Sequence, residues 1–358
     1  THGEKVVKRR VLQRSAVRVR VDEPGRNEET RRFETLCRFD RRGRFALHPS
    51  DGSVAWQRAG SGSVSSLTTE GVSLFALRSG AFAADARFVG DQLTLISPIV
   101  VPVLGGEVAL DAFTLSGALV EGASPTWSAS ASVAAISLDQ LTRELQWPPF
   151  SGSLSAELND MRYREQMLEV GGGLRLRAFD GEIRVSGLRV LDPLGVAPIV
   201  TADASMRGLD LEQLTRTFSF GLIEGRLDGD LDALRLVAWE PDRFDLHLYT
   251  PPGDRARRRI SQRAVENLTE LGSGIPTGLS VPLLGLYEEF GYSAIDLKIE
   301  LRGDAASIDG LARDDGGYYL VRGSGLPRID VIGRNRRVAW RDLVERLKEI
   351  QVEQAKIE

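Results

Sequence analysis

Apolar and charged residues alternate one by one along much of this chain, and this pattern limits what the chain can fold into. The clearest runs are residues 17–21, 174–177, 244–248 and 295–302. Because successive side chains of a β-strand point to opposite faces, each run predicts a strand with one apolar and one charged face. We therefore expect a mainly β protein built from antiparallel strands, with each sheet wetted on one face only.

Turn residues support many short strands. Glycine occurs 37 times and aromatic residues make up only 7% of the chain, which suits strands and tight turns better than helices. Asp-Gly pairs predict turns between strands at 51–52, 180–181, 228–229 and 309–310.

Helices are expected to be few. Two short helices are predicted to begin at Ser137 and Asp210, because each is a capping residue followed three positions later by glutamine. Apolar residues at helical spacing predict a longer helix over 255–271 and a last one over 338–351.

The chain contains an internal repeat with a period of 73 residues. Residues 138–162 align with 211–235 without a gap, and nine of these 25 positions are identical. Unrelated sequences would share one or two by chance, so duplication is the better explanation. The repeating unit is a strand, a short capped helix and further strands, and it predicts an array of stacked sheet units.

The apolar face of so much sheet has to be covered, because burial is worth about 25 cal/mol per Å². Four short helices cannot cover it all. Two sheets packed as a sandwich, a sheet coiled on itself, and a trough lined by lipid chains all satisfy the pattern. Small residues at 80–84 and 128–133 would leave space inside a curved sheet.

Catalytic and metal-binding motifs are not found. Cys37 stands alone, and His2, His48 and His247 lie far apart without a ligand at metal-site spacing. The Asp314–Asp315 pair is interpreted as a turn rather than as a pair of catalytic carboxylates. A net charge of −4 argues against a general nucleic-acid binder, and no apolar stretch approaches the 18 or so residues of a spanning helix.

Basic residues are concentrated in two places. Residues 1–44 hold fourteen Lys and Arg against seven Asp and Glu. Arg258 and Arg259 fall on the helix predicted over 255–271. Both are interpreted as solvated faces, with contact to an anionic surface or to lipid headgroups as the alternative.

Segments near the C-terminal end are more specific. Residues 285–297 and 319–333, followed by 338–340, resemble the C-terminal domain of the YdbH family of AsmA-like proteins. Residues 205–236 look like the repeating element of that family. The resemblance covers about 130–350, and 1–130 continue only its general pattern.

The resemblance implies a bridge-like lipid-transfer protein of the Gram-negative envelope. Such a protein would be periplasmic and would carry phospholipid as cargo, with no cofactor and no catalytic residues. It would be anchored in the inner membrane by an upstream helix, and a small outer-membrane lipoprotein would add strands at the C-terminal end. The expected fold is an elongated, twisted β-groove, with residues 1–130 at its N-terminal part, 131–250 as repeat units and 251–358 as the C-terminal module.

The apolar positions of the alternating runs are the candidate lining of such a groove. They are Phe82, Phe88, Leu95, Val108, Leu110, Leu115, Leu154, Leu158, Leu174, Leu176, Phe179, Ile183, Val185, Leu227, Leu231, Leu246, Leu248, Ile295, Leu297, Ile299 and Tyr319. Two other hypotheses stay open at this point. One is a structural or binding β-array of the envelope with a dry core, and the other is an enzyme on a β-solenoid, which would need carboxylates clustered on one strand face.

Overall fold

The computed structural model describes residues 17–21, 28–35, 39–41, 45–57, 60, 62–74, 76–118, 120, 122–145, 151–193, 195–273 and 288–346. Within these ranges, side chains are described from residue 46 onward, apart from 270–273. The chain forms two compact units. Unit 1 comprises residues 1–147 and 153–174, and unit 2 comprises 148–152 and 175–358.

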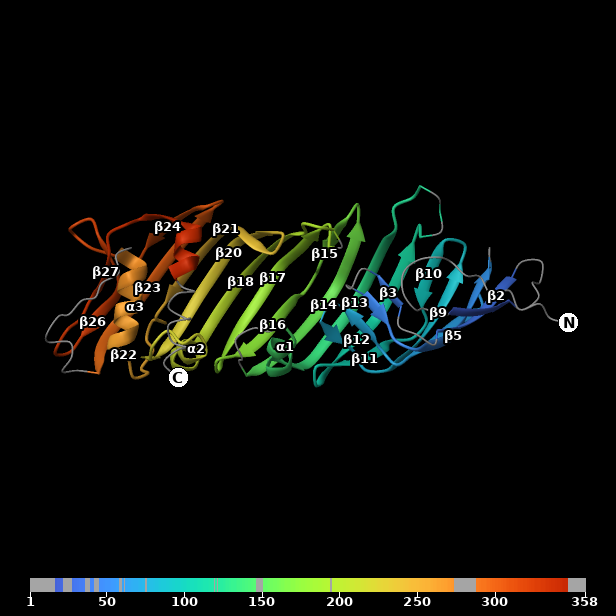
Figure 1. Cartoon of the computed structure of the whole chain (residues 1–358), viewed down its shortest axis with the longest axis horizontal. Helices are drawn as coiled ribbons and strands as arrows, with labels where there is room; N and C mark the ends of the chain where they lie inside the picture. The colour runs from blue at the N-terminus through green and yellow to red at the C-terminus, as the bar shows by residue number, and fades with distance from the viewer. Residues whose placement is uncertain are drawn as a thin grey trace. The chain divides into compact units, whose positions relative to one another are not determined.

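Unit 1 is a meander of strands that pair antiparallel, apart from a short parallel pairing between β5 and β9 (Figure 1). Its main sheet pairs β1, β2, β5, β6, β9, β10, β12, β13, β14 and β15 in that order, and β11 pairs with β12. The strands of this sheet are β1 (Val17–Val21), β2 (Glu28–Thr35), β5 (Ser50–Gln57), β6 (Val64–Thr69), β9 (Phe82–Val89), β10 (Gln92–Leu95), β11 (Ile99–Val103), β12 (Gly106–Ser116), β13 (Thr126–Ser137), β14 (Gly152–Arg164) and β15 (Met167–Glu169). A smaller sheet joins β3 (Phe39–Arg41), β4 (Phe45–Leu47), β7 (Val72–Leu74) and β8 (Leu77–Arg78).

Unit 2 continues the same kind of meander, and β16 (Gly173–Ala178) crosses the boundary between the units. Its strands are β17 (Gly181–Leu191), β18 (Ile199–Asp210), β19 (Ile223–Glu224), β20 (Arg226–Val237), β21 (Glu240–Tyr249), β22 (Arg259–Ser261), β23 (Glu289–Arg302), β24 (Ala305–Asp309), β25 (Leu311–Ala312), β26 (Tyr318–Ser324), β27 (Val331–Gly333) and β28 (Arg337–Ala339). The order β17, β18, β20, β21, β23, β24, β28 is antiparallel throughout.

Strand β23 is the branch point of unit 2. Its second half pairs with β21 and β24, whereas its first half pairs with β22 and β26. Two sets of neighbours therefore diverge from one long strand.

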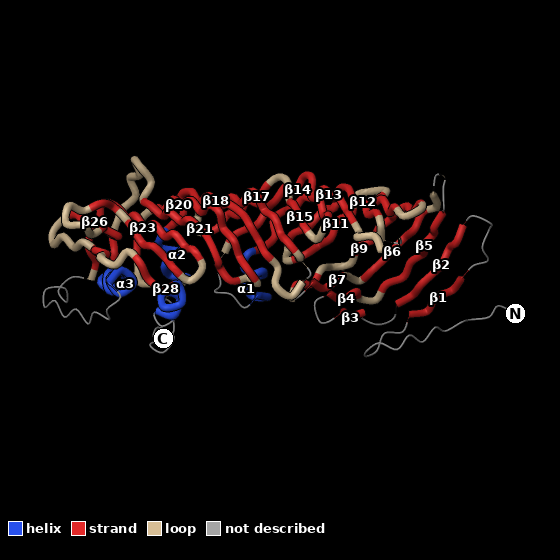
Figure 2. Tube along the Cα trace, turned by 90° about the horizontal axis from the view of Figure 1, so that it is seen from above, coloured by secondary structure: helices blue, strands red, loops and turns tan. Residues whose placement is uncertain are grey.

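Short helices supply the rest of the fold. They are α1 (Leu138–Leu145) in unit 1, α2 (Leu211–Thr217) and α3 (Gln262–Ser273) in unit 2, and a helical stretch at 340–346. In Figure 2, α2 and α3 lie on the same side of the unit 2 sheet. The expected mainly β, antiparallel, repeat-built fold with a few short helices is confirmed.

The 73-residue repeat corresponds to matching local structure. Strand β13 and helix α1 in the first copy match β18 and α2 in the second, with β18 displaced from β13 by 73 positions at both ends. Register shifts occur after Ala129 and Val133 in β13, and after Ala202 and Met206 in β18, at the same offset. Duplication has thus preserved the bulges as well as the sequence, and bulges bend the strands that carry them.

The longer helix begins later than the sequence predicts. Residues 259–261 form β22, and α3 begins only at Gln262. Ile260 is 1% exposed and pairs with Ile223, while the Ser261 hydroxyl accepts a hydrogen bond from the Ala264 amide as a helix cap does. The predicted helix over 338–351 also begins later, because 337–339 pair as β28, and residues 347–351 lie outside the described part of the chain.

Candidate functional site

An unbroken row of apolar side chains crosses six strands of unit 1. Each member of the row is the cross-strand partner of the next member, from β9 to β15, and all of them lie on one face of the sheet. The members are Phe88, Leu93, Leu115, Trp127, Tyr163 and Leu168. Every one of them is half-buried rather than fully enclosed.

Aromatic rings lie at the centre of this row. The Trp127 and Tyr163 rings stack with centroids 5.8 Å apart and planes 13° from parallel. Phe113 lies next to them, with its centroid 6.1 Å from that of Trp127. Stacked rings give a flat and rigid apolar surface. A second row lies beside the first and consists of Ile99, Leu110, Ala131 and Leu158.

Of the candidate lining residues of unit 1, Phe88 and Leu115 lie in the first row, and Leu110 and Leu158 lie in the second. Phe82, Phe88, Leu95, Val108, Leu110, Leu115, Leu154, Leu158 and Leu174 are all half-buried. Four members of the row, Leu93, Trp127, Tyr163 and Leu168, are not among the predicted lining residues. Tyr163 alternates with Arg162 and Arg164, which is the same signal that identified the others.

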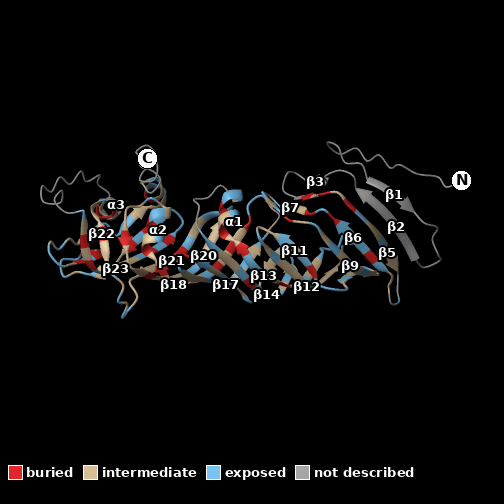
Figure 3. Ribbon diagram, turned by 90° about the horizontal axis from the view of Figure 1, so that it is seen from below, coloured by how far each residue is buried: buried red, intermediate tan, exposed pale blue. Residues whose placement is uncertain are grey.

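Unit 2 also has rows of apolar side chains across its strands, but helices cover this face of the sheet. One row runs Val185, Ala204, Leu231, Leu246, Ile299 and Ile308 across six strands. Helices α2 and α3 and residues 340–346 contribute Leu211, Ala264 and Leu343 to a buried cluster with Leu227, Phe290 and Tyr318. In the described part of the chain, the clusters of fully buried apolar residues lie in unit 2. Figure 3 shows buried positions gathered next to α2 and α3.

A cavity of about 280 Å³ remains between this sheet face and the helices. Fourteen of its fifteen lining residues are apolar, and the other is a threonine. They are Leu211, Leu214, Thr215, Phe218, Phe220, Ile223, Leu227, Leu248, Leu268, Ile295, Leu297, Ile299, Ile308, Leu320 and Leu343. The Thr215 hydroxyl donates to the Leu211 carbonyl oxygen at 2.7 Å, so this polar group is satisfied within α2. The site therefore suits an apolar ligand that makes few hydrogen bonds.

The candidate lining residues of unit 2 separate into groups. Leu227, Leu248, Ile295, Leu297 and Ile299 line the cavity. Leu231 and Leu246 pack against a second cluster, which contains Phe244 and Leu301.

The remaining candidates lie elsewhere in unit 2. Ile183 packs against the larger cluster, Phe179 is buried beside Phe218, and Leu176 and Val185 are half-buried. Tyr319 lies outside both clusters, and the Arg313 guanidinium lies 4.7 Å from the centre of its ring.

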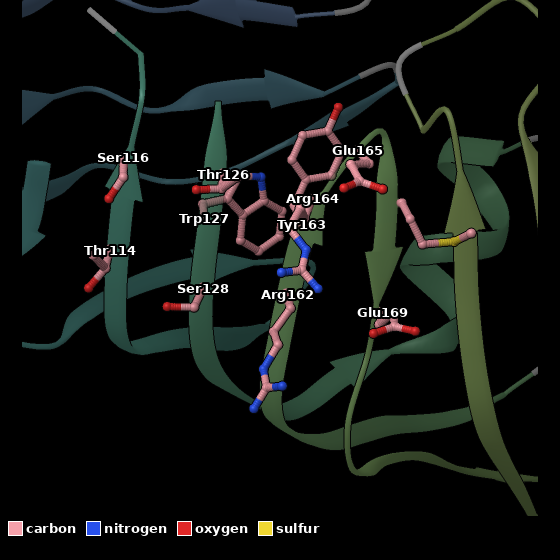
Figure 4. Close-up of a pocket in the computed structure, with 11 residues that line it drawn as sticks. Thr114, Ser116, Thr126, Trp127, Ser128, Arg162, Tyr163, Arg164, Glu165 and Glu169 are labelled. Carbon is pink, nitrogen blue, oxygen red and sulfur yellow. The ribbon is translucent and has the colours of Figure 1, made fainter. Parts of the chain in front are cut away.

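A second hollow, of about 570 Å³, lies over β12 to β15 of unit 1 (Figure 4). Hydroxyl groups on β12 and β13 and charged side chains on β14, its turn and β15 line it, together with Trp127 and Tyr163 of the apolar row. The polar members include Thr114, Ser128, Arg162, Arg164 and Glu169. Arg162 is paired with Asp160 at 2.7 Å, and two glutamates oppose the two arginines. This balance gives the hollow no preference for an anion.

Two polar residues singled out in the sequence, His247 and Arg258, have structural partners. His247 Nε2 lies 3.1 Å from Asp296 Oδ2 on the face opposite Leu246 and Leu248. Arg258 precedes α3 and donates to the Ser293 carbonyl oxygen, rather than lying on a helix face as predicted.

The Asp314–Asp315 pair forms the turn before β26. Asp315 accepts two hydrogen bonds from the Arg313 guanidinium, at 2.9 and 2.7 Å. These bonds hold the pKa of this carboxyl well below its usual range, so the group stays ionised at neutral pH. Among the described residues, no three His, Cys, Asp or Glu side chains are grouped to hold a metal ion.

Two buried tyrosines make the stability of unit 2 sensitive to alkali. The Tyr292 hydroxyl donates to the Glu224 carbonyl oxygen at 2.7 Å, and the Tyr318 hydroxyl donates to that of Asn335 at 2.9 Å. Burial raises the pKa of Tyr292 above its usual range and the pKa of Tyr318 to about 12.

We expect stability to fall as the pH rises above about 10, because the unfolded tyrosines ionise there first. Below that pH both tyrosines are protonated in either state and stability is unaffected. Thermal unfolding of the whole chain between pH 8 and 12 tests this. The Tyr292→Phe, Tyr318→Phe double variant should be less stable at neutral pH but lose less on alkalinisation, and an unchanged alkaline loss would contradict the assignment.

The described fold and site define a mainly β protein whose sheets have one charged face and one apolar face. The apolar face is half-buried in unit 1 and is covered by helices in unit 2. None of the family models, curated proteins or solved structures compared with the chain matches it. None of the helices in the described ranges has the length and hydrophobicity that crossing a bilayer requires.

Proposed function

We propose that this protein binds the acyl chains of phospholipids on its apolar sheet face and passes them along that face between membranes. The observation that carries the proposal is the row of half-buried apolar residues from Phe88 to Leu168 in unit 1. A sheet face of this kind normally packs against protein, because exposing it to water costs about 25 cal/mol per Å². A lipid chain would cover it instead.

The composition of the two faces supports the same proposal. The partners of the row on the opposite face are Thr114, Ser128, Arg162 and Glu169, so each strand presents apolar groups on one side and hydrated groups on the other. Acyl chains need no hydrogen bonds and can slide along such a row, while their headgroups remain in water. Transport between the inner and outer membranes of a Gram-negative envelope, with a small lipoprotein adding strands at the C-terminal end, rests on the resemblance to the YdbH family.

The cavity of unit 2 extends the proposal to the C-terminal part of the chain. Its volume of about 280 Å³ is close to the lower end of ligand pockets, which hold about 300–1,000 Å³. A single acyl tail is the kind of ligand that its apolar lining would accept.

A structural or binding β-array is the alternative function. The covering of the unit 2 sheet by α2, α3 and residues 340–346 favours it, since a face sealed by protein needs no ligand. In that case the half-buried row of unit 1 would serve as a surface for a protein partner.

Extraction of the purified chain followed by lipid mass spectrometry distinguishes these functions. We expect phospholipid to co-purify in stoichiometric amounts and to survive extensive washing. Protein purified from cells without any bound lipid, and unable to take up phospholipid when it is supplied, would contradict lipid binding and favour the structural alternative.

A further inference from the structure

Two neighbouring turns of unit 2 expose large apolar side chains. Trp239 is 64% exposed in the turn between β20 and β21, and Val196 is 90% exposed in the loop between β17 and β18. Leu191, at the end of β17, is 36% exposed. Turns are ordinarily built from glycine, proline and small polar residues, so exposed tryptophan, valine and leucine are unusual at these positions.

The two turns lie at the same rim of the sheet. Leu191 pairs with Ile199, which pairs in turn with Val237 next to the Trp239 turn. The Ala238 amide donates to the Pro198 carbonyl oxygen at 2.9 Å and ties the turns together (Figure 1). The three exposed side chains therefore belong to one patch, which we call the Trp239 rim and define as Leu191, Val196 and Trp239.

The backbone at Trp239 is unfavourable for a tryptophan. Val237 pairs with Glu240 across a two-residue turn in which Ala238 has φ 52° and Trp239 has φ 70°. Turns with two positive φ values strongly prefer Asn-Gly, and a bulky residue in this region is strained. Strain that a fold retains at an exposed position suggests a role for the side chain outside the fold.

The charges around the rim indicate what it touches. The segments 189–198 and 235–243 contain equal numbers of basic and acidic residues. The basic residues are Arg189, Arg235 and Arg243, and the acidic residues are Asp192, Glu240 and Asp242. Arg235 and Asp242 pair with each other. An electrically neutral patch has no attraction to an anionic surface, whereas an indole ring partitions into the zone between headgroups and acyl chains.

We propose that the Trp239 rim inserts into the interfacial zone of a lipid bilayer and docks unit 2 on a membrane surface. The occupant is the bilayer itself, recognised by apolar insertion and not by headgroup charge. This inference goes beyond lipid binding on the sheet face, because the rim lies at the strand ends and its residues do not line the cavity. Docking of the Trp239 rim would bring the adjacent ends of β17, β18, β20 and β21 to the membrane that supplies the lipid.

Flotation of the whole chain with phosphatidylcholine vesicles tests the docking. We expect the chain to float with the vesicles equally well at 0.1 and 0.5 M salt. Its tryptophan emission should shift to shorter wavelength with vesicles, and this shift should be lost when Trp239 is replaced. The Ala238→Asn, Trp239→Gly double variant suits the turn better, so it should unfold at a higher temperature while its vesicle binding falls at least tenfold.

Leu326→Ser provides the matched control. Leu326 is 99% exposed, but it follows β26 at the opposite strand ends, where Ser324 pairs with Gly291. Its loss should leave vesicle binding unchanged. Undiminished binding by the double variant, binding abolished by salt, or no vesicle binding at all would each overturn the docking proposal. Bound phospholipid in the double variant, measured separately, reports on the sheet face, so failure of one proposal is distinguishable from failure of the other.

Discussion

Replacing Leu115 with arginine should reduce the movement of fluorescent phospholipid between two vesicle populations at least tenfold. Leu115 lies in the middle of the unit 1 row, between Leu93 and Trp127. A charged side chain placed among acyl chains costs about 2.5–3.5 kcal/mol, which corresponds to roughly a hundredfold in affinity. Leu115 is only half-buried, so the arginine can reach water in the empty protein and the fold should tolerate it.

Thr114→Arg is the matched control for this change. It places the same side chain one residue away on the same strand but on the opposite face, in register with Ser128. Transfer should continue at the wild-type rate. Equal loss of transfer in both variants would indicate damage to the strand, and undiminished transfer by Leu115→Arg would contradict a lipid path over this row.

The second large effect is expected on stability. Leu301 is fully buried and packs with Phe244, Ile299 and Ala306, and Phe244 meets Trp340 edge to face. Leu301→Ala should lower the free energy of unfolding by about 3 kcal/mol, because it removes buried methyl groups and leaves a cavity. Denaturant unfolding of the whole chain, followed by circular dichroism, measures the loss.

Glu300→Ala controls for the change in strand composition. Glu300 is the exposed neighbour of Leu301 on β23, so its replacement should alter the free energy of unfolding by less than about 0.5 kcal/mol. A small effect of Leu301→Ala would mean that the helices do not seal this part of unit 2. The face would then be open there as it is in unit 1.

The alternation of residues predicted which side chains share a face, because that property depends only on the two-residue period of a strand. Leu246, Leu248, Leu297 and Ile299 fall on one face as expected, and His247 falls on the other. The capping pattern predicted the two short helices because it is also local in sequence. Asp210 accepts a hydrogen bond from the Gln213 amide, and the Ser137 hydroxyl accepts one from the Gln140 amide.

Features that depend on distant parts of the chain were predicted less well. Two of the four Asp-Gly pairs are not turns, because residues 51–52 lie within β5 and residues 228–229 lie within β20. The Asp228 carboxylate accepts from the Gly208 amide at 2.7 Å, and a side chain at Gly229 would meet Leu248. The cavity could not be predicted from the sequence either, because it depends on how α2, α3 and residues 340–346 pack against the sheet.

Photo-crosslinking tests the central claim most directly. The whole chain would be loaded with a phospholipid that carries a diazirine on its acyl chain, irradiated, and mapped by peptide mass spectrometry. We expect adducts on the peptides that carry the unit 1 row and the unit 2 cavity, at residues such as Leu115, Trp127 and Leu248, and none on Thr114, Ser128 or Arg162. Adducts spread equally over both faces of β12 to β14, or confined to the charged face, would contradict a lipid path along the apolar face.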